Sequence, residues 1–289
     1  PYWPIETTMP SDNKALPTAS AARGLGASKV DTAYNGMNKA IDTINEIKTK
    51  LVAAQGASDA DKQTYDIDIK ALQKQLQSYA DASTFSGANW LSTNTTNAAT
   101  AGTFDDVKIV ASFNRDTTGA VKLGTIDVKV QDIKLYDVGK TDETDAGILD
   151  GTRNATGARA AAQAVTIGDE AAAGDTYTVD SLSLFDSATG KVASDSQIMD
   201  MLGVIEGALK DMTTAATNLG AAKTRINLQQ IFTASLMDSI DRGIGQLVDA
   251  DMNKESTRLQ ALQVQQQLGI QALSIANQNS QSILSLFRQ

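Results

Sequence analysis

Apolar residues in the first eighty positions fall on two helical seams. From Val30 onward they recur at alternating steps of four and three residues, which places them on one face of a helix. Gly56 interrupts this pattern, Ser58 or Asp59 is suited to cap a new helix, and a second seam then runs to Tyr79. Two antiparallel helices with a short connection are therefore predicted. We expect their buried faces to contain Val30, Met37, Ile41, Ile44, Leu51, Ile69, Leu72 and Leu76.

The same seam returns near the other end of the chain, from Ile198 to Ile226. A helix of that length spans roughly 44 Å at about 1.5 Å per residue. Because one helix cannot bury its apolar stripe against itself, this segment is predicted to pack on the two N-terminal helices. The core positions predicted for it are Leu202, Ile205, Leu209, Met212, Leu219 and Ile226.

Residues 104–193 have a different pattern, in which apolar and polar residues alternate. Val107–Phe113 and Thr125–Val130 have the period of two that is typical of strands, and Ile133–Tyr136 and Thr176–Val179 are predicted to be shorter strands. The predicted fold class is therefore mainly α with a β-rich insertion. A long helical bundle comes from both chain ends, and a small α+β or β domain lies between them.

The tail, Met252–Gln289, is apolar on more than one face and has few charges. Glu255 is its last acidic residue, and only Arg258 and Arg288 carry side-chain charge beyond it. An uncharged helix of this kind can lie among copies of itself without charge repulsion, which predicts an assembly interface. The interface residues predicted are Leu259, Leu262, Val264, Leu268, Ile270, Leu273, Ile275, Ile283, Leu284, Leu286 and Phe287.

Composition excludes several function classes. The formal charge of −9 disfavours nucleic acid as a partner. The sequence contains no run of about 18 apolar residues, so no membrane span is predicted. The sequence has no histidine and no cysteine, so it lacks the commonest general base and metal ligand and cannot form disulfides. Gly24 and Gly26 follow no predicted strand and do not form a phosphate-binding loop. We therefore predict neither catalysis nor a cofactor.

Acidic residues concentrate in residues 104–193, which contain nine Lys and Arg against fifteen Asp and Glu, a difference of −6. Asp142, Glu143, Asp145 and Asp150 form a cluster that offers carboxylates to Ca²⁺. Their spacing does not match the EF-hand loop, so a solvated acidic loop without a metal is the favoured interpretation.

Several segments resemble bacterial flagellins. Asp241–Met252, Leu268–Gln278 and the ending Ile283–Arg288 are similar to the C-terminal signature of that family. Ser83–Leu91 resembles the turn that follows its second N-terminal helix, and Lys29–Tyr34 resembles flagellins of alphaproteobacteria. The resemblance covers residues 1–103 and 194–289.

This resemblance implies a structural subunit of the flagellar filament, exported by the flagellar type III apparatus and located outside the cell. Its partners would be other flagellin subunits, an export chaperone and the filament cap. Residues 1–103 and 194–248 would form the helical wall, 104–193 a surface-exposed domain, and 249–289 an inner-tube helix. By the same resemblance, the sequence lacks about 50 N-terminal residues of the family.

Two alternatives stay open at this point. A junction protein between hook and filament shares the terminal helices, although the ending of this chain favours a filament flagellin. A surface-binding protein on the same scaffold would grip a ligand with residues 104–193, but neither Trp3 nor Trp90 lies there. All four prolines fall within residues 1–17, so we expect continuous helix only from about Thr18.

Overall fold

The computed structural model describes residues 3–288, with side chains from Leu16 onward except at position 113. The chain divides into two compact units. The larger unit is Thr18–Phe232, and the smaller one combines Pro1–Pro17 with Thr233–Gln289. Long helices run through both units.

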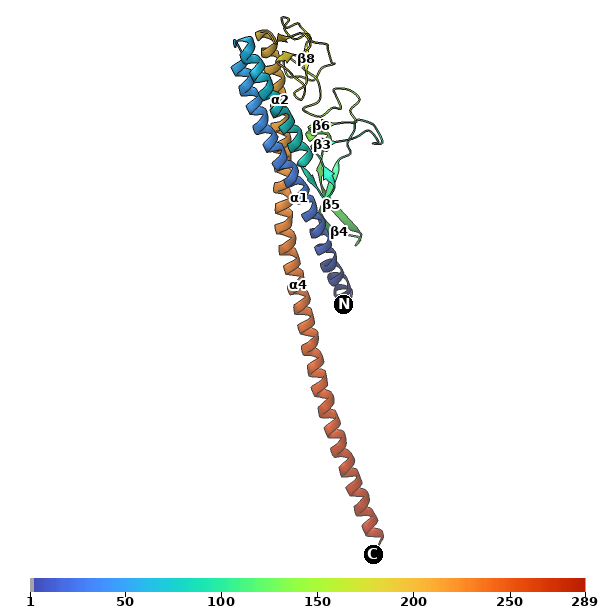
Figure 1. Cartoon of the computed structure of the whole chain (residues 1–289). Coiled ribbons are helices and arrows are strands. Elements are labelled where there is room, and N and C mark those ends of the chain that lie inside the picture. The colour runs from blue at the N-terminus through green and yellow to red at the C-terminus, as the bar shows by residue number, and fades with distance from the viewer. Residues whose placement is uncertain (1–2, 289) are drawn as a thin grey trace. The chain divides into compact units, whose positions relative to one another are not determined.

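Three long helices build the larger unit. Helix α1 spans Trp3–Ala54, α2 spans Asp59–Ala82 and α4 spans Asp195–Phe287, and within residues 18–232 they lie side by side (Figure 1). Gly56 makes the turn between α1 and α2 with a φ of 70°, where a side chain would be strained. Ser58 caps α2 by accepting a hydrogen bond from Asp61 N at 3.2 Å, so the predicted capping position is confirmed.

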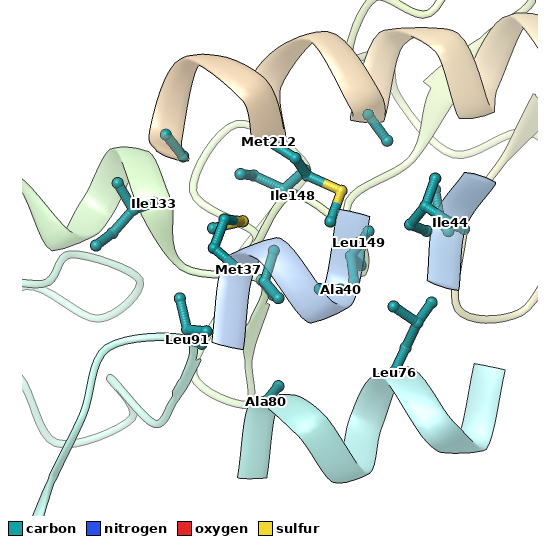
Figure 2. Packing of buried hydrophobic residues seen from close by; sticks show 14 of the residues in the cluster. Met37, Ala40, Ile44, Leu76, Ala80, Leu91, Ile133, Ile148, Leu149 and Met212 are labelled. Carbon is teal, nitrogen blue, oxygen red and sulfur yellow. The ribbon is translucent and has the colours of Figure 1, made fainter. Parts of the chain in front are cut away.

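The helices meet in one hydrophobic cluster. Met37 and Ile44 of α1 face Leu76 of α2 and Met212 of α4, as Figure 2 shows. Residues between the helical segments join the same cluster, among them Ile133 and Leu149, so a single core serves residues 18–232. The interior is mainly aliphatic, because Ile, Leu, Met and Ala occupy most of the buried seam positions.

Among residues 3–288, strands are few and mostly short. The one long pair is an antiparallel hairpin of β4, Val107–Arg115, and β5, Val121–Val128, and the helical turn α3, Val130–Ile133, follows it. The other strands have two residues each and pair as β1–β2, β3–β6, β7–β8 and β9–β10. Their bounds are Thr84–Phe85 (β1), Ala88–Asn89 (β2), Ser92–Thr93 (β3), Tyr136–Asp137 (β6), Arg153–Asn154 (β7), Thr176–Tyr177 (β8), Phe185–Asp186 (β9) and Lys191–Val192 (β10).

The strand predicted at Ile133–Tyr136 is wrong. Ile133 ends α3, and only Tyr136 enters a strand. The backbone N–H groups of Leu135 and Tyr136 both donate to the carbonyl of Leu91, at 2.8 and 3.0 Å. Ile133, Leu135 and Tyr136 are all buried, but they lie at the end of α3, in a connection and in β6. The apolar–polar–apolar order that suggested a strand arises from this burial and not from strand geometry. In the same way Val130 belongs to α3 rather than β5, and β8 stops before the predicted end.

The expectation that continuous helix begins only near Thr18 is also wrong. Helix α1 begins at Trp3 and passes through Pro4, Pro10 and Pro17. Pro4 lies in the first turn, where a backbone N–H has no helical partner to lose. The two later prolines each leave one carbonyl unpaired. Pro17 is exposed, so water can bind the carbonyl four residues earlier that lacks its helical N–H partner. The helix therefore tolerates the missing hydrogen bond.

In the smaller unit, residues 3–17 belong to α1 and residues 233–287 to α4. Every described residue from Val248 to Arg288 is exposed within the chain. Helix α4 nevertheless continues through this part without a break, including Gly269. This unpaired stretch is the first candidate for a surface that functions in assembly.

Candidate assembly surfaces

The predicted core residues of the bundle lie in the hydrophobic cluster or against it. Ile41, Leu72, Leu202 and Leu209 are half-buried and pack against the cluster. The remaining positions are at most 1% exposed, namely Val30, Met37, Ile44, Leu51, Ile69, Leu76, Ile205, Met212, Leu219 and Ile226. The apolar seams between residues 30 and 226 are therefore covered by packing within one chain.

Buried charges fasten residues 104–193 to the helices. Asp66 of α2 accepts hydrogen bonds from the Ser183 hydroxyl and from Leu184 N, both at 2.8 Å. Arg153 is 2% exposed and pairs with Asp211 of α4 at 2.7 Å. Because each link joins segments far apart in the chain, the middle region is held on α2 and α4 by specific polar contacts.

The most deeply buried ion pair joins Lys134 and Asp137, whose Nζ and Oδ2 atoms lie 2.5 Å apart and are fully buried. Asp137 also accepts hydrogen bonds from Thr95 N and Gly139 N at Oδ1 and from the Thr95 hydroxyl at Oδ2. Burial alone would raise the pKa of Asp137, but the hydrogen bonds from Lys134 and Thr95 outweigh it and lower that pKa. The network fixes β3 beside β6, a parallel pair.

The acidic cluster has no common centre for a cation. Asp145 accepts hydrogen bonds from Thr141 N and Asp142 N, and Asp150 accepts one from Asp137 N while Lys140 lies 3.6 Å from its carboxylate. Among the side chains that the structure describes, from Leu16 onward, no three Asp or Glu residues gather closely enough to hold a metal ion. The cluster residues therefore act as turn caps and partners for local N–H groups.

Apolar side chains on the tail of α4 lie on two opposite stripes. At about 100° per residue, Leu259, Ile270 and Leu273 fall on one side, and Val264 and Leu268 fall about half a turn away. All eleven predicted interface residues are at least half exposed, with Leu262, Ile275, Ile283, Leu284, Leu286 and Phe287 completing the set. A helix with two such stripes needs two partners to cover it.

Sequence reasoning missed an apolar group just beyond the core. Leu228, Ile231 and Phe232 of α4 are between 59 and 66% exposed. The three residues are spaced three and four apart, which was the available signal, but at about 100° per residue they fall on the face of α4 opposite the seam that ends at Ile226. Nothing local in the sequence marked the buried Arg23 or Lys134, because their burial depends on segments distant in the chain.

Within residues 3–288, no helix is long and apolar enough to cross a membrane. The comparisons with known proteins agree with the geometry. The bacterial flagellin N-terminal helical region matches residues 2–96, and the bacterial flagellin C-terminal helical region matches residues 202–287. The chain belongs to the bacterial flagellin family.

Its relatives are flagellins of alphaproteobacteria. Flagellin C of Rhizobium meliloti (strain 1021) is 44% identical, with 100% of this chain and 86% of the relative covered. The flagellin of Brucella melitensis biotype 1 is 42% identical, with 99% and 84% covered, and flagellin A of Rhizobium meliloti is 37% identical, with 99% and 89% covered.

Flagellins are the structural subunits of the extracellular flagellar filament. This flagellin is therefore a structural protein that polymerises with other flagellin subunits, and not an enzyme. Two kinds of surface are thus distinguished by the structure. The seams of residues 30–226 are covered within the chain, whereas those of the tail are not.

Proposed function

We propose that this flagellin assembles through the two apolar stripes on the tail of α4. The carrying observation is that every described residue from Val248 to Arg288 is exposed while eleven of them are the large apolar residues predicted as the interface. A monomer that exposes so much apolar surface gains free energy by covering it. Each stripe would pack on a different neighbouring helix.

The magnitude of this gain is large for a single helix. Fully burying a Leu or Ile side chain is worth about 1.5–3 kcal/mol. The scarcity of charge matters equally, because desolvating an unpaired charge would cancel the gain from several such side chains. A helix filled with Gln, Ser and Asn between its apolar stripes avoids that penalty.

The regions of the chain receive the following roles in this proposal. Residues 1–103 and 194–248 form the helical wall of the filament, and residues 249–289 form the inner-tube helix. Residues 104–193, which carry most of the negative charge, face water. The variant Ser187→Cys, in the exposed turn between β9 and β10, should react with a maleimide on intact filaments, because the chain has no other thiol. Protection of the introduced thiol in filaments would overturn the outward placement.

We further propose an export chaperone and the filament cap as partners, with the apolar tail as the part a chaperone would shield before assembly. Co-purification from the native cell should lose the chaperone when residues 249–289 are removed. Retention of the same partner by the shortened chain would place its binding site elsewhere.

The two stripes can be tested separately. Leu268→Asp and Leu273→Asp place one charge on opposite faces of the same helix, and each should prevent filament growth. Gln267→Asp is the matched control, because Gln267 lies between the stripes and receives the same charge. Polymerisation of purified monomer, followed by sedimentation, gives the readout. If Leu273→Asp polymerises as well as Gln267→Asp, the first stripe is not an interface.

Hydrogen exchange provides an independent test. In dilute monomer, amides beyond Lys254 should exchange fast and those across Ile198–Ile226 slowly, since only the latter segment packs within the chain. In filaments the tail amides should become the slower set. A tail that is already protected in monomer would contradict its role as an assembly surface.

A further inference from the structure

The β4–β5 hairpin changes its apolar face halfway along. On β5, Ile126 and Val128 are buried, whereas Val121 and Leu123 are 50 and 57% exposed. Since side chains alternate along a strand, these two pairs point to opposite faces. We call Val121 and Leu123 the hairpin ridge.

Strand β4 has a β-bulge at Ala111, at the point along the hairpin where the exposed apolar face changes. The register runs from Val110 opposite Thr125 to Ser112 opposite Gly124, so Ala111 is the extra residue. Arg23 of α1 is fully buried and its Nη1 donates to the Ala111 carbonyl at 2.5 Å. A hydrogen bond from a guanidinium thus holds the bulge against α1, and the distal half of the hairpin presents its ridge outward.

A partly open hollow of about 260 Å³ lies at the base of the same hairpin. Its walls include Ile126 and Val128 of β5 and Leu219 and Ala222 of α4. The volume exceeds the ~150 Å³ of an apolar cavity that holds a benzene-sized molecule, so it admits aliphatic side chains. We call this hollow the α4 groove.

Charged side chains line the rim of the α4 groove. Lys129, Asp132 and Arg225 line it, and none of them makes an ion pair with another described side chain. An apolar floor with unpaired charges around it is typical of a protein–protein contact.

The ridge of one chain cannot reach the groove of the same chain. Leu123 lies three residues from Ile126 along an extended strand, roughly 10 Å away, and on the opposite face. The ridge and the groove are therefore not covered by each other within one chain. In a self-assembling protein, every further copy presents a ridge and a groove that can cover them.

We infer that the hairpin ridge of one flagellin subunit docks in the α4 groove of a second copy of this chain. The contact joins two different surfaces, so it is heterologous: each added copy leaves one free ridge and one free groove, and a row of subunits can grow without closing. This inference rests on the proposed function, because it names a contact within the filament.

Paired cysteines test the contact in the full chain, which has no cysteine of its own. Leu123→Cys combined with Ala221→Cys, an exposed residue of the groove, should give a ladder of covalent oligomers when filaments are treated with a short bismaleimide. Each single variant should stay monomeric on a denaturing gel. Met199→Cys, exposed on α4 and roughly 33 Å along the helix from Ala221, replaces Ala221→Cys in the control pair and should give no ladder.

The outcomes separate this inference from the proposed function. Filaments that form normally but give no ladder would overturn the ridge–groove contact and leave assembly through the tail intact. Crosslinking by Leu123→Cys alone would show a symmetric contact and would also overturn it. Absence of filaments from the wild-type chain would instead refute the proposed function.

Charged variants give a second readout that needs no crosslink. Leu123→Asp should raise the critical concentration for polymerisation at least about tenfold, whereas Val138→Asp, at an exposed valine outside both features, should not. Ala221→Trp blocks the groove but keeps an intact ridge, whereas Leu123→Asp keeps an intact groove. A mixture of the two variants should therefore form one ridge–groove contact per pair. Equal polymerisation of Leu123→Asp and Val138→Asp would contradict the docking.

Discussion

The buried pair of Lys134 and Asp137 permits a sharp test of how polar contacts hold the middle region. Asp137→Asn keeps an acceptor oxygen for the backbone N–H groups of Thr95 and Gly139 but removes the negative charge. Lys134 would then keep only the carbonyl of Gly102, 3.1 Å from its ammonium group, as a partner. An uncompensated charge is left in a fully buried site.

Breaking a buried ion pair from one side costs about 3–5 kcal/mol. For a unit of the size of residues 18–232, about 1 kcal/mol shifts Tm by roughly 2–4 °C. The variant should therefore melt roughly 6–20 °C below the wild type when monomer is followed by circular dichroism at pH 7. Asp142→Asn is the control, because that carboxylate caps a turn at the surface, and its loss should change Tm little.

The pH dependence has a definite sign. The pKa of Asp137 is lowered in the fold, so the charged pair stabilises the protein above the unfolded pKa of about 3.9 and loses this contribution as pH falls through the lower folded pKa. The gap in Tm between wild type and Asp137→Asn should be constant from pH 7 to about pH 5 and shrink below pH 4. Lys134→Met with Asp137→Asn should cost less than the two single changes together. Additive effects, or a Tm equal to that of Asp142→Asn, would refute the assignment of the pair as a coupled buried unit.

Two other substitutions have clear expectations. Burial, and then the nearby charge of Asp150, raise the pKa of Asp180, so its charged form opposes folding as pH rises through the folded pKa. Asp180→Asn should stabilise monomer at pH 7 by up to ~1 kcal/mol in urea unfolding, and the gain should fade toward pH 4; a loss of stability at pH 7 would contradict the sign. Leu76→Ala, at a fully buried site, should cost about 2–5 kcal/mol, and Leu72→Ala, half-buried four residues earlier, clearly less. Equal costs measured in the same unfolding assay would mean that the seam is not packed as described.

The sequence by itself determined the helical seams and the family. Helical periodicity is a local property, so the four-three spacing from Val30 to Leu51 and from Ile198 to Ile226 predicted helices that the structure contains. The apolar, nearly uncharged tail likewise showed its nature without any tertiary information, because composition alone decides whether a helix can be buried by copies of itself. The flagellin signature in Asp241–Met252 is also a matter of residue order.

Only the tertiary structure decided which polar residues are buried and how the middle region is held. Arg23, Lys134 and Asp137 look like surface residues in the sequence, since the segments that bury them lie far away in the chain, as the contacts of Arg23 with Ala111 and of Asp137 with Thr95 show. Ile133–Tyr136 reads as a strand, but the carbonyl of Leu91 holds it as a loop. The exposure of Val121 and Leu123 also depends on tertiary structure, because the bulge that packs on α1 sets which face of the hairpin is covered. A sequence pattern does not contain the packing of such distant segments.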